Sequence, residues 1–165
     1  MDIQRMNAAA RIAPVYVVWN GEILIDAPIA DVWRHALDYP SWQNYSTVRR
    51  ISGEAGCEGE VMQLKKEEAG LNLPPYYART IKLDPPRRVI WKTYRDSPDY
   101  FGIVEFRFDV VGGSTRFCNN LLYEHLITYQ NESEVEEFRK RRYEMVELSA
   151  ASILPKLKRI AERRT

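Results

Sequence analysis

The sequence has few of the residues that build disulfide frameworks and metal centres. Among its 165 residues there are only two cysteines, Cys57 and Cys118, and two histidines, His35 and His125. Two cysteines cannot form a disulfide framework, and the four residues together do not show the spacing of a zinc site. We therefore expect no metal site and no cofactor.

An excess of one charge and a long hydrophobic run are also lacking. Lys and Arg total 24 against 23 for Asp and Glu, a net charge of +1, so no strong field attracts nucleic acid or anionic lipid. No stretch approaches the roughly 20 apolar residues that span a bilayer. Arg11 and Pro14 interrupt the N-terminus before a signal-peptide core forms. We expect a cytoplasmic protein without stable membrane insertion, either a monomer or a homodimer.

Aromatic residues, in contrast, are abundant. They make up 12% of the chain and include ten Tyr and four Trp, more than a small core needs, because each buried Tyr or Trp brings a polar tip that requires a partner. The length is that of one domain. Residues 1–14 lack periodicity and are predicted to form a flexible tail, and residues 15–165 a single domain.

The pattern of hydrophobic residues predicts an α+β fold. A strand over 15–25 is followed by a short helix over 28–37 and a second short helix over 41–45. Asn131 and Glu134 resemble a reciprocal helix cap, and a long amphipathic C-terminal helix follows them. Six further strands, separated by short turns, are expected to form an antiparallel sheet with the first; they cover 47–52, 59–66, 76–83, 89–94, 102–111 and 115–128.

Several short motifs together resemble a known superfamily. The motifs are Ile25-Asp26-Ala27-Pro28, Val32-Trp33, Asp38, Trp42, Gly59, the run from Leu83 to Val89, and Gly113-Ser114-Thr115-Arg116. They resemble the START-like helix-grip superfamily, SRPBCC, of the polyketide cyclase/dehydratase and lipid-transport type. This resemblance implies a curved seven-stranded antiparallel sheet that wraps around the C-terminal helix and encloses a deep cavity. It implies a fold more directly than a chemistry.

Alternation along the strands predicts which side chains face that cavity. Residues 102–111 alternate cleanly, which directs Phe106 and Phe108 inward. The predicted ligand-binding residues are Tyr77, Arg79, Trp91, Phe106, Phe108, Asn119, Tyr123, Phe138, Arg142 and Met145.

Each polar member of this set has a second interpretation. A bulge before Ile81 would turn Arg79 toward solvent, and Arg142 can enter the cavity or extend out of it. Asn119 and Tyr123 can equally form structural hydrogen bonds. His125 shares their side of the strand but lies near its end, where we expect solvent. A filled core is as consistent with periodicity as a cavity.

Two loops with exposed apolar residues are expected at one rim of the sheet. Leu73 lies in the first, and Tyr100 and Phe101 close the second. Large apolar side chains next to proline are typical of a lid over an apolar site. The alternatives are a dimer contact or packing against the helix.

These observations favour binding of a small hydrophobic molecule, aromatic, polyketide-like or lipid, by a carrier or sensor. The chain shows no catalytic motif comparable to a nucleophile elbow or a phosphate loop. The alternative is an enzyme of the polyketide cyclase/dehydratase type, which needs few dedicated residues. A weaker hypothesis is an interaction module that uses the basic run from Arg139 to Arg142.

Overall fold

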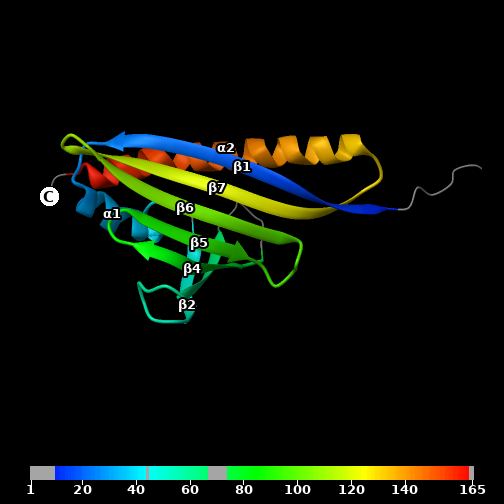
Figure 1. Cartoon of the computed structure of the whole chain (residues 1–165), viewed down its shortest axis with the longest axis horizontal. Helices are drawn as coiled ribbons and strands as arrows, with labels where there is room; N and C mark the ends of the chain where they lie inside the picture. Colours follow the sequence, from blue (N-terminus) through cyan, green and yellow to red (C-terminus); the bar gives the residue numbers. More distant parts are fainter. Residues whose placement is uncertain (1–9, 44, 67–73, 164–165) are drawn as a thin grey trace, which may run out of the picture.

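One antiparallel sheet forms the body of the protein (Figure 1). The computed structural model describes residues 10–43, 45–66 and 74–163. In the sheet the strands follow the order β1-β7-β6-β5-β4-β3-β2, so β1 and β2 form its two edges. The strands are β1 (Arg11–Ile25), β2 (Tyr45–Ser52), β3 (Val61–Lys66), β4 (Tyr76–Asp84), β5 (Arg88–Tyr94), β6 (Tyr100–Val111) and β7 (Ser114–Tyr129).

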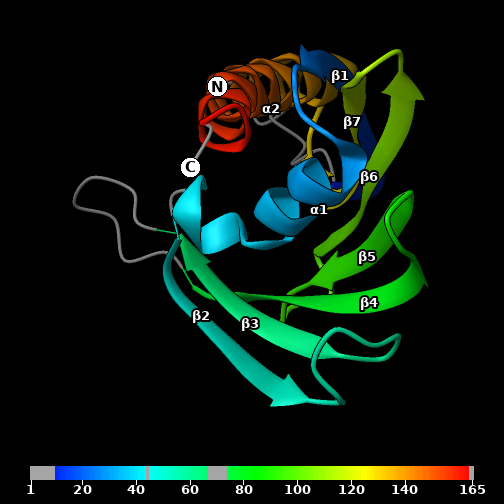
Figure 2. The ribbon, with the colours of Figure 1, turned by 90° about the vertical axis from the view of Figure 1, so that its left-hand side faces the viewer.

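The sheet curves around the helices, as Figure 2 shows, and the predicted helix-grip fold is confirmed. The long helix α2 (Glu132–Ala161) begins where predicted, because Asn131 Oδ1 accepts a hydrogen bond from the Glu134 backbone N–H at 3.2 Å. The Glu134 carboxylate in turn accepts from the Gln130 backbone N–H at 2.8 Å. Within the described ranges, no helix is long and apolar enough to cross a membrane.

The first strand begins earlier than predicted. Arg11 pairs with Tyr129 at the end of β7, so residues 11–14 belong to the sheet and the predicted tail of 14 residues is too long. Pro14 is tolerated because β1 is an edge strand, where a missing backbone donor breaks no ladder. Pairing with the long β7 thus extends β1 beyond the stretch of strong strand propensity.

Two short helical segments close one end of the molecule, as expected from the sequence. Helix α1 covers Ile29–Leu37, and the single turn η1 covers Tyr39–Ser41, two residues before the predicted start at Ser41. Trp42 Nε1 donates to the Ala36 carbonyl at 3.2 Å, which holds the turn against α1.

The core at the α1 end is filled by aromatic rings in edge contacts. The Trp33 and Phe108 ring centroids are 5.2 Å apart, and the Phe106 and Phe117 centroids 5.0 Å. Phe108 and Phe117 are almost fully buried. The opposite end, where α2 begins, carries the buried polar residues Thr93 and His125.

Candidate ligand-binding site

Four tyrosine side chains lie close together on the concave face of the sheet, at the end of the molecule away from α1. Tyr45, Tyr76 and Tyr100 are the first residues of β2, β4 and β6, and Tyr123 lies near the end of β7. In an antiparallel sheet every second strand starts at the same end of the sheet, and the strands between them finish at that end. The Tyr45 and Tyr76 hydroxyls are 2.5 Å apart, and the Tyr100 and Tyr123 ring centroids 5.8 Å. These four residues are called the tyrosine cluster below.

The cluster keeps its hydroxyls protonated. Burial raises the pKa of Tyr45 to about 12, although its hydrogen bond with Tyr76 acts in the other direction. Burial also raises the pKa of Tyr76 and of Tyr123 well above the ordinary value of 10.0. The pKa of Tyr100 is raised by burial too, and its hydroxyl lies 3.1 Å from Thr93 Oγ1. The cluster therefore offers neutral O–H groups, which both donate and accept hydrogen bonds.

His125 joins the tyrosine cluster to α2. Only 8% of His125 is exposed, and its ring centroid lies 5.3 Å from that of Tyr100 and 5.6 Å from that of Phe138. Arg142 Nη2 is 3.2 Å from His125 Nε2, and a guanidinium can only donate, so Nε2 is assigned as the acceptor. Burial, reinforced by the charges of Arg142 and Arg95, lowers the pKa of His125 to about 4. The imidazole is therefore neutral at pH 7.

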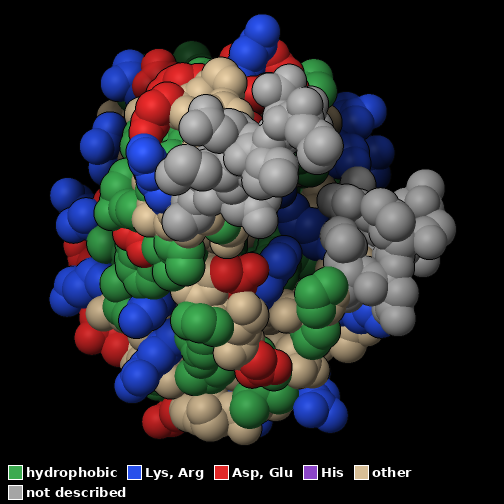
Figure 3. Space-filling view, turned by 90° about the vertical axis from the view of Figure 1, so that its right-hand side faces the viewer, with side chains coloured by type: hydrophobic (Ala, Val, Ile, Leu, Met, Phe, Trp, Pro, Cys, Tyr) green, Lys and Arg blue, Asp and Glu red, His purple; other side chains and the backbone are tan. Residues whose placement is uncertain are grey.

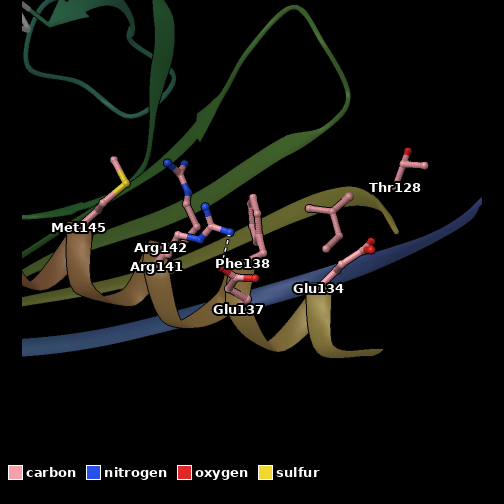
Figure 4. A pocket seen from close by; sticks show the side chains of 8 residues that line it. Thr128, Glu134, Glu137, Phe138, Arg141, Arg142 and Met145 are labelled. Carbon is pink, nitrogen blue, oxygen red and sulfur yellow. Dashed lines mark ion pairs between the residues drawn. The ribbon is translucent and has the colours of Figure 1, made fainter. Parts of the chain in front are cut away.

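A pocket of about 520 Å³ lies between the first half of α2 and the end of β7. Figure 4 shows Phe138, Arg142 and Met145 projecting from α2 toward the strands, and Arg141 paired with Glu137. Figure 3 looks onto this end of the molecule, where hydrophobic side chains alternate with charged ones. The lining residues are Ile127, Thr128, Glu134, Glu137, Phe138, Arg141, Arg142 and Met145. Phe138 and Arg142 also touch His125, so the pocket adjoins the tyrosine cluster.

The prediction that Arg79 and Tyr77 face the interior is wrong. Arg79 is exposed, and Ala78 and Thr80 are the buried residues of this part of β4. The pairing with β5 shifts between Thr80 and Lys82, so the chain bulges at Ile81. Side chains alternate between the two faces of the sheet only where the strand is regular. Counting this alternation backward from the inward-facing Leu83, across the bulge, therefore assigns the preceding residues to the wrong face.

Tyr77 lies on the same outer face as Arg79. Its ring stacks on Tyr94 with centroids 5.4 Å apart, and its hydroxyl lies 3.4 Å from Asp96 Oδ2. These contacts use both the ring and the hydroxyl of Tyr77 outside the interior. Neither Tyr77 nor Arg79 belongs to the candidate site.

The structure gives no support to the predicted lid. Tyr100 and Phe101 begin β6 instead of closing a loop. Tyr100 faces the interior as part of the tyrosine cluster, whereas the outward Phe101 ring lies 5.2 Å from Lys92 Nζ. Because successive side chains of a strand point to opposite faces, the two cannot act together as a lid. Leu73, the third residue of that prediction, lies outside the described residues.

Four other predicted residues lie on the concave face but closer to α1. Trp91 and Phe106 form an edge contact with centroids 4.9 Å apart, and Phe108 packs against Trp33. Asn119 is 2% exposed, and its Oδ1 has no hydrogen-bond partner in the part of the chain that the structure describes. These residues belong to the core, whereas Tyr123, Phe138, Arg142 and Met145 lie at the pocket or the tyrosine cluster.

The sequence analysis missed several residues of the site. Tyr45 was assigned to the end of the second short helix, whereas it begins β2, Tyr76 was placed at a strand start without a direction, and His125 was expected near solvent. The signal that identifies them is their position at strand ends on the side where α2 begins. In residues 10–43, 45–66 and 74–163, no group of three or more His, Cys, Asp or Glu is placed to hold a metal ion.

Comparisons with known proteins agree with this fold. Neither a family model nor a curated protein sequence matches the chain. Among solved structures, the Zhui aromatase/cyclase from Streptomyces sp. R1128 is 19% identical with a TM-score of 0.67, over 90% of this chain and 95% of that one. Norcoclaurine synthase from Thalictrum flavum, a point mutant with a transition state analogue, is 12% identical with a TM-score of 0.65, over 92% and 97%.

A third structure belongs to a longer protein. The di-domain ARO/CYC StfQ of the steffimycin biosynthetic pathway is 12% identical with a TM-score of 0.69, over 91% of this chain and 52% of that one. At these identities the similarity concerns the fold. The chain has the helix-grip fold of SRPBCC proteins, as the sequence motifs indicated.

Proposed function

We propose that this protein binds a small hydrophobic molecule, aromatic, polyketide-like or lipid, as a carrier or sensor. The observation that carries the proposal is the pocket of about 520 Å³. Two residues of its wall, Phe138 and Arg142, also contact the buried His125. This volume lies within the range of roughly 300 to 1,000 Å³ that is typical of ligand pockets. Phe138, Met145 and Ile127 supply the apolar part of the wall.

The tyrosine hydroxyls next to the pocket indicate which polar atoms the ligand carries. A buried O–H group that a ligand can reach favours a ligand with a matching oxygen or nitrogen atom, since an unmatched one costs about 1 to 3 kcal/mol. From the pocket, contacts lead from Arg142 to His125, from His125 to Tyr100, and from Tyr100 to Tyr123. Tyr100 and Tyr123 are therefore the tyrosines nearest to the pocket along these contacts. A hydrophobic molecule with one or a few oxygen substituents fits this arrangement.

The protonation states favour binding over acid–base catalysis. A general acid or base works best with a pKa near the operating pH. Burial moves the pKa of His125 down to about 4 and that of Tyr45 up to about 12, so both groups are neutral at pH 7 and far from their titration range. Neutral groups of this kind orient a ligand through hydrogen bonds.

A titration with the uncharged fluorescent probe N-phenyl-1-naphthylamine tests the proposal. We expect one saturable site per chain at pH 7. Phe138→Ser should weaken binding by roughly 10- to 100-fold, since burying a Phe side chain contributes about 1.5 to 3 kcal/mol. The matched control is Phe101→Ser, which removes an aromatic ring from the outer face. Equal effects of both substitutions, or binding only to acid-expanded protein, would contradict the proposal.

An enzyme of the polyketide cyclase/dehydratase type is the second proposal. The observation that favours it is the gathering of four tyrosine hydroxyls, which can hold the carbonyl oxygens of a folded chain in one geometry. The two proposals differ in one measurement. Tyr100→Phe lowers turnover at saturating substrate in an enzyme, whereas in a carrier it changes only the affinity.

A further inference from the structure

Two basic side chains lie directly opposite each other on the outer face of the sheet, which is turned away from α1 and α2 (Figure 2). Arg79 of β4 is the register partner of Lys92 of β5, and both are exposed. The Cβ atoms of residues paired in this way are about 4.5 to 5.5 Å apart, and like charges in such a pair destabilise a sheet. Arg79 and Lys92 are called the basic pair below.

A second pair of opposed cations on the same face is neutralised by carboxylates. Arg88 of β5 and Arg107 of β6 are also register partners. Arg88 Nε lies 2.5 Å from Glu105 Oε1, and Arg107 Nε lies 3.3 Å from Asp109 Oδ2. The basic pair, in contrast, forms no ion pair with any residue in the described part of the chain. Its two positive charges therefore lack the compensation that the neighbouring pair has.

The basic pair borders a pocket of about 280 Å³, distinct from the one at the start of α2. The pocket lies where the bulge of β4 at Ile81 interrupts the pairing with β5. Space is open beside Gly59, because a Cβ added there would meet no atom within 4 Å. The lining residues are Glu58, Gly59, Arg79, Thr80, Ile81 and Lys92. A small group can therefore lie against both cations at once.

The acidic residue of this wall, Glu58, is engaged by other groups. Its Oε1 accepts a hydrogen bond from the Leu83 backbone N–H at 2.9 Å and lies 3.3 Å from Lys82 Nζ. These contacts lower the pKa of Glu58, so its carboxylate is charged at pH 7. Since Lys82 balances that charge, the basic pair leaves the pocket with an excess of two positive charges.

We propose that this outer pocket binds a phosphate group, held between Arg79 and Lys92. A phosphate monoester has a second pKa of about 6 and carries nearly two negative charges at pH 7.5, which matches the excess charge of the pocket. The planar guanidinium can donate to two phosphate oxygens, and the ammonium adds a point charge. Ile81, which is 44% exposed, offers an apolar contact to the organic part of a phosphate ester. A free phosphate ester and a phospholipid headgroup share this chemistry.

The test is isothermal titration with inorganic phosphate and with phenyl phosphate at pH 7.5 and low salt. We expect one site per chain, with an affinity that falls as NaCl is added, because the cations are exposed. Arg79→Gln and Lys92→Gln should each weaken binding by roughly tenfold, the lower end of the range for charge-assisted hydrogen bonds. The matched controls Arg88→Gln and Arg107→Gln remove cations of the neutralised pair and should change the affinity by less than about twofold.

Two further substitutions at Lys92 separate charge from shape. Lys92→Arg retains the positive charge and should keep phosphate binding within about threefold of the wild type. Lys92→Glu places a carboxylate directly opposite Arg79 and should abolish binding, because the protein then supplies the anion itself. Binding that survives Lys92→Glu would overturn the proposal.

Sedimentation with phosphatidylcholine vesicles, with and without phosphatidic acid, distinguishes the two sources of the phosphate. Binding to the phosphatidic acid vesicles that is lost in Arg79→Gln and Lys92→Gln identifies a lipid headgroup. Binding of phenyl phosphate without vesicle binding identifies a free phosphate ester.

The site is refuted if phosphate, phenyl phosphate and the vesicles all fail to bind, or if the four glutamine variants lose affinity equally. Neither result affects the proposed function, because N-phenyl-1-naphthylamine reports on the other pocket.

Discussion

The pH dependence of stability gives a direct test of the contact between His125 and Arg142. In the folded protein, burial and the two arginine charges lower the pKa of His125 from 6.5 to about 4. Above pH 6.5 the imidazole is neutral in both the folded and the unfolded chain, so it adds no pH dependence there. As the pH falls from 6.5 toward 4, the unfolded chain binds a proton that the folded protein does not, and stability is lost.

The shift sets the size of this effect. At 1.36 kcal/mol per pKa unit, the free energy of unfolding should fall by about 2 to 3 kcal/mol between pH 7.5 and 4.5 through His125 alone. The assay is urea denaturation at several pH values for the wild type and for His125→Gln, which cannot titrate. The difference between the two proteins isolates the histidine from the carboxylates that also titrate in acid.

Parallel profiles for the wild type and His125→Gln would refute the buried, arginine-linked imidazole described above, because a solvent-exposed histidine has no reason to favour its neutral form.

Three further predictions concern the sheet and the helix. Gly102→Ala should lower the free energy of unfolding by about 1 to 3 kcal/mol in urea denaturation, because the added Cβ would lie 2.3 Å from Thr93 Oγ1 and 2.7 Å from the Tyr123 ring; an unchanged stability would show that the strands can separate there without cost. Arg79→Met should change stability by less than about 0.5 kcal/mol and leave the affinity for N-phenyl-1-naphthylamine unaltered, since Arg79 is exposed; weaker binding would return it to the site. Asn131→Ala should cost about 1 kcal/mol in thermal or urea denaturation, because it removes the acceptor at the start of α2; no loss would mean that other groups cap the helix equally well.

Local sequence signals were sufficient for the order of the elements. Turn residues at 53–56 and 112–113 and the alternation of 102–111 identify strands because a half-buried strand requires period-two hydrophobicity. The start of α2 was equally readable, since Asn131 and Glu134 form their contacts within four residues of each other. The concave-face assignment of Phe106 and Phe108 followed from the same alternation, because β6 has a regular register with both neighbours.

The direction of β4 could not be read in the same way. A bulge at Ile81 reverses the parity of Tyr77 and Arg79, and the bulge exists only as a shift in the pairing with β5. The register between two strands depends on both of them, so the sequence of neither strand alone reveals the bulge. The early start of β1 has the same cause, because Arg11 to Pro14 are ordered by the end of β7.

The sequence by itself determined that this protein has a curved antiparallel sheet and a long amphipathic helix, because these depend on periodicity and turn chemistry within short segments. Only the tertiary structure decided which polar groups meet. Tyr45, Tyr100, His125 and Arg142 come from β2, β6, β7 and α2, and their contacts depend on how far each strand extends and on where α2 lies along β1. Burial then sets their pKa values, and burial is a property of the assembled chain.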